Sequence, residues 1–213
     1  MDENTKTDEV IAIANEESDD NMISTAPWHI FVLFGIGKRI LILLMFVIAL
    51  VAVTGWGINN DIHIVEIISG YVTVIFLLWL SAIDLQSYIL PNKILLIWLS
   101  CRVILLFIGL VVTESPEILI QSMGGAGAMG LIFLIIHYLS KRSLGGGDVK
   151  LSFVLGLSLT MTMVFTAMFY AVVACSIVAI VGLILKKLNR KDSLPLGPFI
   201  FIGTVVAYLF HLF

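Results

Sequence analysis

Residues 151–185 form a run of 35 positions without a charged side chain. As one straight helix this run would be about 52 Å long, whereas the hydrocarbon core of a bilayer is only about 30 Å thick. Two full-length spans would leave almost no residues for a turn between them. We therefore predict a short span over residues 151–160, a tight turn near residues 161–163, and a full span that ends at residue 185.

Long apolar runs also recur in the rest of the chain. Hydrophobic residues make up 60% of the 213 positions and charged residues only 13%, a balance that a water-soluble domain of this size could not hide in its core. The sequence therefore predicts an all-α, polytopic bundle of six or seven transmembrane helices, depending on whether residues 151–160 cross the membrane or re-enter it. The other expected spans are residues 40–56, 64–83, 94–112, 118–139 and 196–213.

The N-terminal part of the chain differs in composition from the membrane part. Eight of the 15 Asp and Glu residues lie in the first twenty positions, and a polar, acidic segment of this kind predicts a disordered tail over residues 1–25. Residues 26–39 are expected to lie at the membrane interface, because Trp28 and His29 suit the depth of the headgroups. Residues 40–213 would then form the membrane-embedded domain.

Lysine and arginine are distributed unequally between the predicted loops. The loops at residues 57–63 and 113–117 contain neither and carry Asp61, Glu114 and Glu117 instead. By the positive-inside rule the other loops face the cytoplasm, together with the N-terminus. Their cations are Lys38, Arg39, Lys93, Lys141, Arg142, Lys150, Lys186, Lys187, Arg190 and Lys191. These small groups give no indication of nucleic-acid binding, and the lipid bilayer is the expected surrounding.

Two acidic residues, Asp84 and Asp148, stand at the cytoplasmic ends of predicted spans. Two carboxyl groups that approach closely cannot both ionise easily, so one of them holds a proton. Such a pair can activate water and protonate a leaving amine, as in the aspartic proteases. The alternative is that each acid is an interfacial charge that marks the end of a span.

A run of three glycines, Gly145, Gly146 and Gly147, precedes Asp148, and Lys150 follows it. Glycine lets a backbone or a substrate approach the acid closely and permits positive φ. The alternative is a flexible loop between two spans. A glycine run alone is a weak signal, but beside an acid that has a second acid on the same membrane face it indicates an active site.

Three segments of the chain resemble the type IV prepilin peptidases. Residues 145–151 (GGGDVKL) are similar to the family's GxGD-x-K-L motif, residues 84–92 (DLQSYILPN) to its other catalytic segment, and residues 194–199 (LPLGPF) to its terminal Pro-Phe-Gly-Pro-Phe-type motif. The resemblance implies that Asp84 and Asp148 are the catalytic pair. It implies supporting roles for Gly145, Gly147, Lys150, Pro91, Asn92, Gly197 and Pro198.

The resemblance also implies the reaction. It points to an aspartic endopeptidase in the inner or plasma membrane of a prokaryote, which cleaves the short basic leader of prepilin-like proteins at the cytoplasmic face. Its partners would be prepilins or pseudopilins with an apolar N-terminal helix, and neither a metal ion nor a cofactor is expected. A small polytopic transporter or a scaffold of an export machine is the alternative, although transporters place their acids near mid-bilayer and are built from repeats.

Two departures from the family pattern matter. The longer bacterial members carry CxxC pairs in an N-terminal loop linked to N-methylation, whereas Cys101 and Cys175 lie singly within apolar runs. N-methyltransferase activity is therefore not expected. Gln86 and Ser87 stand where the family has a basic residue after the first Asp.

Two features within the spans lie outside these motifs. Arg102 is in the middle of the predicted span 94–112, where such a charge either faces the bundle interior or snorkels to the interface. Glycine and alanine at residues 124–128 form a small-residue face on the span 118–139, which predicts close packing of another helix.

Overall fold

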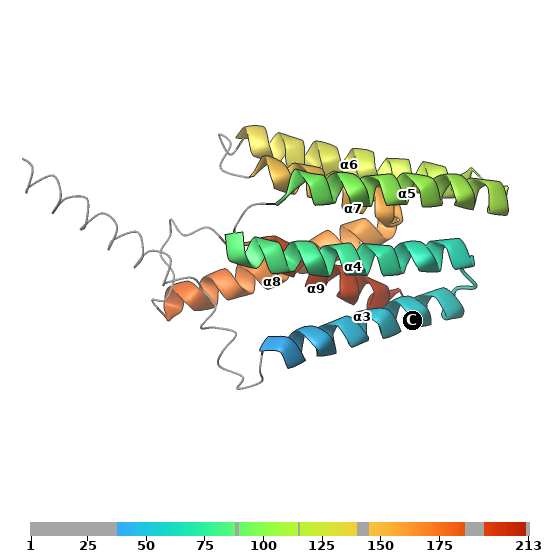
Figure 1. Cartoon of the computed structure of the whole chain (residues 1–213). Coiled ribbons are helices and arrows are strands. Elements are labelled where there is room, and N and C mark those ends of the chain that lie inside the picture. The colour runs from blue at the N-terminus through green and yellow to red at the C-terminus, as the bar shows by residue number, and fades with distance from the viewer. Residues whose placement is uncertain (1–37, 88–89, 115, 140–144, 186–193, 212–213) are drawn as a thin grey trace, which may run out of the picture. The chain divides into compact units, whose positions relative to one another are not determined.

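The computed structural model describes residues 38–87, 90–114, 116–139, 145–185 and 194–211, and over these residues it contains seven helices (Figure 1). They are α3 (Lys38–Asn59), α4 (Ile64–Ser87), α5 (Asn92–Thr113), α6 (Glu117–Leu139), α7 (Gly146–Ser158), α8 (Met161–Ile184) and α9 (Gly197–Phe210). Five of them, α3, α4, α5, α6 and α8, are long and apolar enough to cross a membrane. The predicted all-α, polytopic bundle is thus confirmed, with α7 and α9 as shorter helices of 13 and 14 residues.

The predicted disordered tail of residues 1–25 lies outside the described residues, and so does most of the predicted interfacial segment of residues 26–39. Lys38 and Arg39, at the end of that segment, already belong to α3. The compact unit considered below comprises Ile42–Phe213.

Apolar side chains cover the outward faces of the long helices. Leu43, Val111, Leu131 and Ile184 are all exposed. In water this surface would drive aggregation, whereas hydrocarbon chains solvate it well. The distribution of exposed side chains therefore fits a bundle whose outer surface is in contact with lipid.

Aromatic pairs fill the contacts between helices inside the bundle. Phe76 of α4 stacks on Trp98 of α5, with ring centroids 6.0 Å apart and planes inclined by 3°. Trp56 of α3 meets Tyr208 of α9 edge to face at 5.4 Å. The first pair thus joins α4 to α5, and the second joins α3 to α9.

The small-residue face of α6 packs directly on α7, as predicted. A Cβ at Gly125 of α6 would lie 2.5 Å from the carbonyl oxygen of Gly156 in α7, and a Cβ at Gly156 would collide with the Gly125 backbone. Glycine at both positions therefore lets the two helix backbones touch. This contact holds α7, which carries Asp148, against a full-length helix.

The turn within residues 151–185 lies earlier than predicted. α7 ends at Ser158 and α8 begins at Met161, so residues 159–160 form the turn rather than residues 161–163. Thr160 is the N-cap of α8, and its side chain accepts a hydrogen bond from the backbone N–H of Met163 at 3.4 Å. Threonine is a favoured N-cap residue, whereas methionine is a good helix former, which explains the correction.

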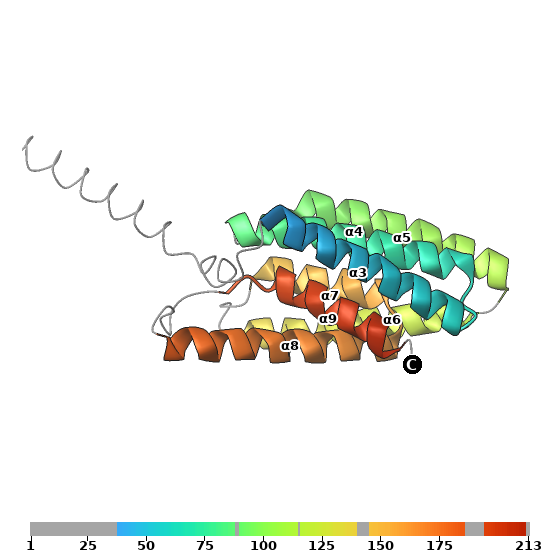
Figure 2. The same ribbon diagram turned by 90° about the horizontal axis from the view of Figure 1, so that it is seen from below.

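Successive helices of the bundle run in opposite directions, as both views show (Figures 1 and 2). The C-terminal end of α4 therefore lies at the same end of the bundle as the N-terminal ends of α5, α7 and α9. Hydrogen bonds join these ends in pairs, α4 to α9 and α5 to α7. The three sequence motifs are carried by these four helix ends.

Candidate active site

Asp84 lies in the last turn of α4 and is buried, with 4% of its surface exposed. Its Oδ2 atom accepts a hydrogen bond of 2.7 Å from the backbone N–H of Gly197, the first residue of α9. The N-terminus of a helix carries N–H groups without intrahelical partners and a partial positive charge. The start of α9 therefore supplies a hydrogen-bond donor to the buried carboxyl group of Asp84.

Gly197 and Pro198 are suited to this contact for different reasons. A Cβ at Gly197 would lie 2.9 Å from Asp84 Oδ2 and 3.3 Å from the Cα of Ser81, so only glycine fits without displacing the acid. Pro198 occupies the first turn of α9, where its missing N–H removes no hydrogen bond. The Gly-Pro pair thus begins a helix directly against a carboxylate.

Asp148 lies in the first turn of α7 and is half-buried. Burial raises the pKa of its carboxyl group from 3.8 to about 6, and the nearby charge of Asp84 contributes to that rise, while a hydrogen bond from the Gly145 backbone opposes it. α4 and α7 also contact each other, and the turns that carry the two acids lie at the same end of the bundle. The fold therefore gathers the two predicted acids, which are 64 positions apart in sequence, at one site.

The three glycines before Asp148 are not the loop that the sequence suggested. Gly146 and Gly147 already belong to α7, and none of the three has a φ in the left-handed region. At two of the three positions, a side chain would lack room. A Cβ at Gly147 would lie 3.0 Å from the Cβ of Leu90, and a Cβ at Gly145 would lie 3.1 Å from Asp148 Oδ2, whereas a Cβ at Gly146 would meet nothing within 4 Å.

These distances predict different effects at the three positions. Gly147→Val should lower cleavage of a prepilin-like peptide, the activity that the motif resemblance implies, by about tenfold or more, because the first turn of α7 must move away from Leu90 and displaces Asp148. Gly146→Ala should change cleavage by less than about twofold, and Gly145→Ala should fall between them. Cleavage is measured at matched membrane expression, and equal activity in all three variants would contradict the steric explanation.

Lys150, Asn92 and Pro91 form a second contact between the motifs. Lys150 Nζ donates a hydrogen bond of 2.9 Å to Asn92 Oδ1, and both side chains are exposed. Pro91 is the N-cap of α5. The predicted supporting residues therefore join the start of α5 to the start of α7, and we assign Lys150 this contact rather than one with either acid.

Ser81 is a polar residue of the site that the sequence did not indicate. It is buried one turn before Asp84, and its hydroxyl has no hydrogen-bond partner within the described part of the chain. A buried hydroxyl without a partner is costly in a stable fold.

A buried charge lies deep in the bundle, away from the two acids. Arg102 is 2% exposed, and its guanidinium group pairs with Glu66 at 3.3 Å. It donates further hydrogen bonds to Ser69 Oγ at 2.6 Å, Ser122 Oγ at 2.9 Å and the Leu157 carbonyl at 2.8 Å. Of the two alternatives for Arg102, the structure shows the one in which it faces the bundle interior.

The site offers two carboxyl groups, each in the terminal turn of a helix. Asp84 accepts a hydrogen bond from the first backbone N–H of α9. Asp148 retains a proton to a higher pH than an ordinary Asp. Among the described residues, no group of three or more His, Cys, Asp or Glu side chains is arranged to hold a metal ion.

Comparison with known proteins adds independent information. The family model described as "Type IV leader peptidase family" matches residues 71–180, just over half of the chain, and includes both acids. The "Prepilin leader peptidase/N-methyltransferase" of Bacillus subtilis (strain 168) is 27% identical over 146 residues, which cover 68% of this chain and 56% of that protein. The chain thus spans little more than half the length of this relative. No solved structure matches the chain.

Proposed function

The chain belongs to the type IV leader peptidase family, and on that premise we propose that it is an aspartic endopeptidase that removes the short basic leader of prepilin-like proteins. The observation that carries the proposal is that the last turn of α4, with Asp84, and the first turn of α7, with Asp148, lie at the same end of the bundle. Asp84 is also held by α9, so three helices converge on the pair.

We assign the two proton transfers of the reaction to the two acids. Asp84, in its ionised form, accepts a proton from water, whose oxygen attacks the scissile carbonyl carbon. Asp148, in its protonated form, donates its proton to the nitrogen that leaves when the C–N bond breaks. Because the two acids titrate as a coupled pair, the proton is shared between them rather than fixed on one oxygen.

The orientation in the membrane follows from the distribution of charge. Every Lys and Arg of the predicted loops lies on one side, which the positive-inside rule assigns to the cytoplasm. The ends of α4 and α7 that carry the acids would then face the cytoplasm of a prokaryotic cell. A prepilin or pseudopilin presents its basic leader on that side and its apolar helix in the bilayer, so its scissile bond would lie at the depth of the two acids.

We expect purified protein in lipid vesicles to cleave a synthetic prepilin-like peptide at a single bond after its basic leader. Mass spectrometry of the product reports the site of cleavage and any added methyl group together. The Bacillus subtilis relative is named for both activities, but we expect a free α-amino group here even when S-adenosylmethionine is present. A product heavier by one methylene would contradict the absence of methylation, and intact peptide would contradict the proposed function.

A further inference from the structure

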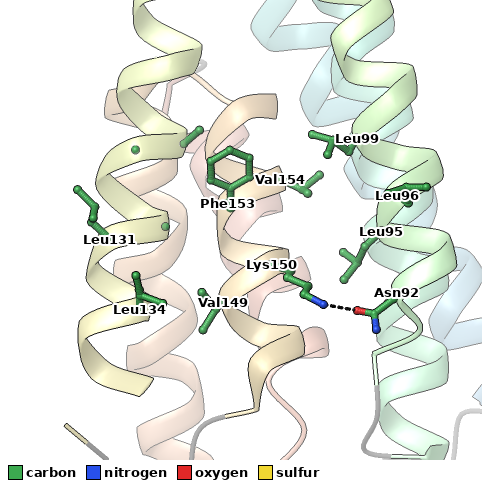
Figure 3. Close-up of a pocket in the computed structure, with 13 residues that line it drawn as sticks. Asn92, Leu95, Leu96, Leu99, Leu131, Leu134, Val149, Lys150, Phe153 and Val154 are labelled. Atoms are coloured by element: carbon green, nitrogen blue, oxygen red, sulfur yellow. Dashed lines mark hydrogen bonds between the residues drawn. The ribbon is translucent and has the colours of Figure 1, made fainter. Parts of the chain in front are cut away.

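An apolar groove of about 510 Å³ lies between α5 and α6, with α7 as its floor (Figure 3). Leu95 and Leu99 of α5 form one wall, Leu131 and Leu134 of α6 form the other, and Phe153 of α7 lies between them. The hydrogen-bonded pair of Lys150 and Asn92 lies at the end of the groove that is nearest to the start of α7.

The groove opens to the side of the bundle and not only to its end. Leu96, Leu131 and Leu134 line it and are exposed, which places its opening on the surface that faces lipid. The second half of α7 is otherwise enclosed, because Leu151, Leu155 and all but one of the residues from Leu151 to Ser158 are buried. The groove is therefore a lateral path from the bilayer to the helix that carries Asp148.

The shape of the groove suits a helix. Gly127 and Gly130 of α6 line it, and a Cβ at Gly127 would meet nothing within 4 Å. Small residues on a membrane helix let a second helix approach its backbone closely. The polarity of the groove is also uneven, since Lys150, the one charged side chain among the described residues that line it, stands at the end near Asp148.

We propose that this groove binds the apolar helix that follows the scissile bond of the substrate, an inference that rests on the proposed function. Val149 and Lys150, which line the groove, are the two residues directly after Asp148. A helix in the groove would therefore bring the peptide bond at its N-terminal end to the acid. The positive charge of Lys150 at this end repels a basic leader, which keeps the leader outside the groove and sets the direction of the substrate.

A pair of substrates tests the proposal. One is a full prepilin-like chain with its apolar helix, and the other is a short peptide that holds the leader and only a few residues beyond the scissile bond. Gly127→Trp fills the groove at a position with open space, whereas Ile120→Trp places the same side chain at an exposed position of α6 outside the groove. Gly127→Trp should lower kcat/KM for the full chain by about tenfold or more, chiefly through KM, and leave the short peptide unchanged. Ile120→Trp should affect neither substrate.

Equal cleavage of the full chain by Gly127→Trp and the wild type would overturn the proposal while the peptidase function stands. Absence of cleavage of both substrates by the wild type would contradict the proposed function instead. A photo-cross-linking residue at Leu131 gives a second measurement that does not depend on filling the groove. It should join the apolar helix of an uncleaved substrate bound to Asp148→Asn protein, and cross-links to phospholipid alone would overturn the proposal.

Discussion

Asp148→Asn should abolish leader cleavage and at the same time make the folded protein more stable at neutral pH. Asparagine keeps the shape of the side chain but cannot donate a proton to the leaving amine. General acid–base catalysis contributes on the order of a thousandfold, so a loss of at least that size is expected. The gain in stability has a separate cause, which is the free energy required to ionise a half-buried carboxyl group beside Asp84.

The pH range of that gain follows from the pKa of Asp148, which rises from 3.8 in the unfolded chain to about 6 in the folded protein. The folded state therefore binds the proton more tightly, and this contribution to stability is lost as the pH rises through about 6. Asparagine removes the ionisation altogether. We expect it to stabilise the protein by about 1–2 kcal/mol at neutral pH, after a reduction for partial solvent screening.

Thermal unfolding in detergent at two pH values measures this effect beside the cleavage assay. The difference in Tm between Asp148→Asn and the wild type should be positive at neutral pH and should vanish below a pH of about 4, where the carboxyl group is protonated in both states. A lower Tm for the variant at neutral pH would contradict the assignment of a partly desolvated acid.

Arg102→Met should destabilise the bundle by about 3–5 kcal/mol, the usual effect of removing one partner of a buried ion pair. The substitution leaves the carboxyl group of Glu66 without its cation and removes the hydrogen bonds to Ser69, Ser122 and the Leu157 carbonyl. The contact with Leu157 lies in the last turn of α7, so α7 should also be held less firmly in the variant.

The matched control for this prediction is the double variant with Arg102→Met and Glu66→Gln. It lacks the unpaired charge, so it should recover part of the lost stability. Thermal unfolding in detergent measures all three proteins. A double variant that is less stable than Arg102→Met alone would contradict the view that Glu66 is the acid paired with Arg102.

The sequence predicted the helices well because membrane spans depend on one property, the length of an apolar run. It did not predict where the short helix α7 begins. Gly146 and Gly147 look like a loop in sequence, but they belong to α7, and the contact that requires glycine is with Leu90, more than fifty positions earlier. Such a contact depends on the tertiary fold and leaves no periodic signal.

In the candidate site, too, the sequence indicated residues but not the contacts between them. The motif resemblance indicated Asp84, Asp148 and the segment at Gly197, but not that the backbone of Gly197 would donate to Asp84, 113 positions away. The sequence also did not indicate the partner of Arg102. Glu66 lies 36 positions before it, in the first turn of the helix that carries Asp84 at its other end. Motifs therefore indicated which residues matter, and packing decided what each one contacts.

The central claim is that Asp84 and Asp148 act as one catalytic unit. It is tested most directly by leader cleavage with Asp84→Asn, Asp148→Asn and the double variant, reconstituted side by side in the same vesicles. Residues that act as a unit are strongly non-additive, so the three variants should show the same residual rate, on the order of a thousandfold or more below the wild type. Substantial cleavage by either single variant, with a further multiplicative loss in the double variant, would contradict the claim.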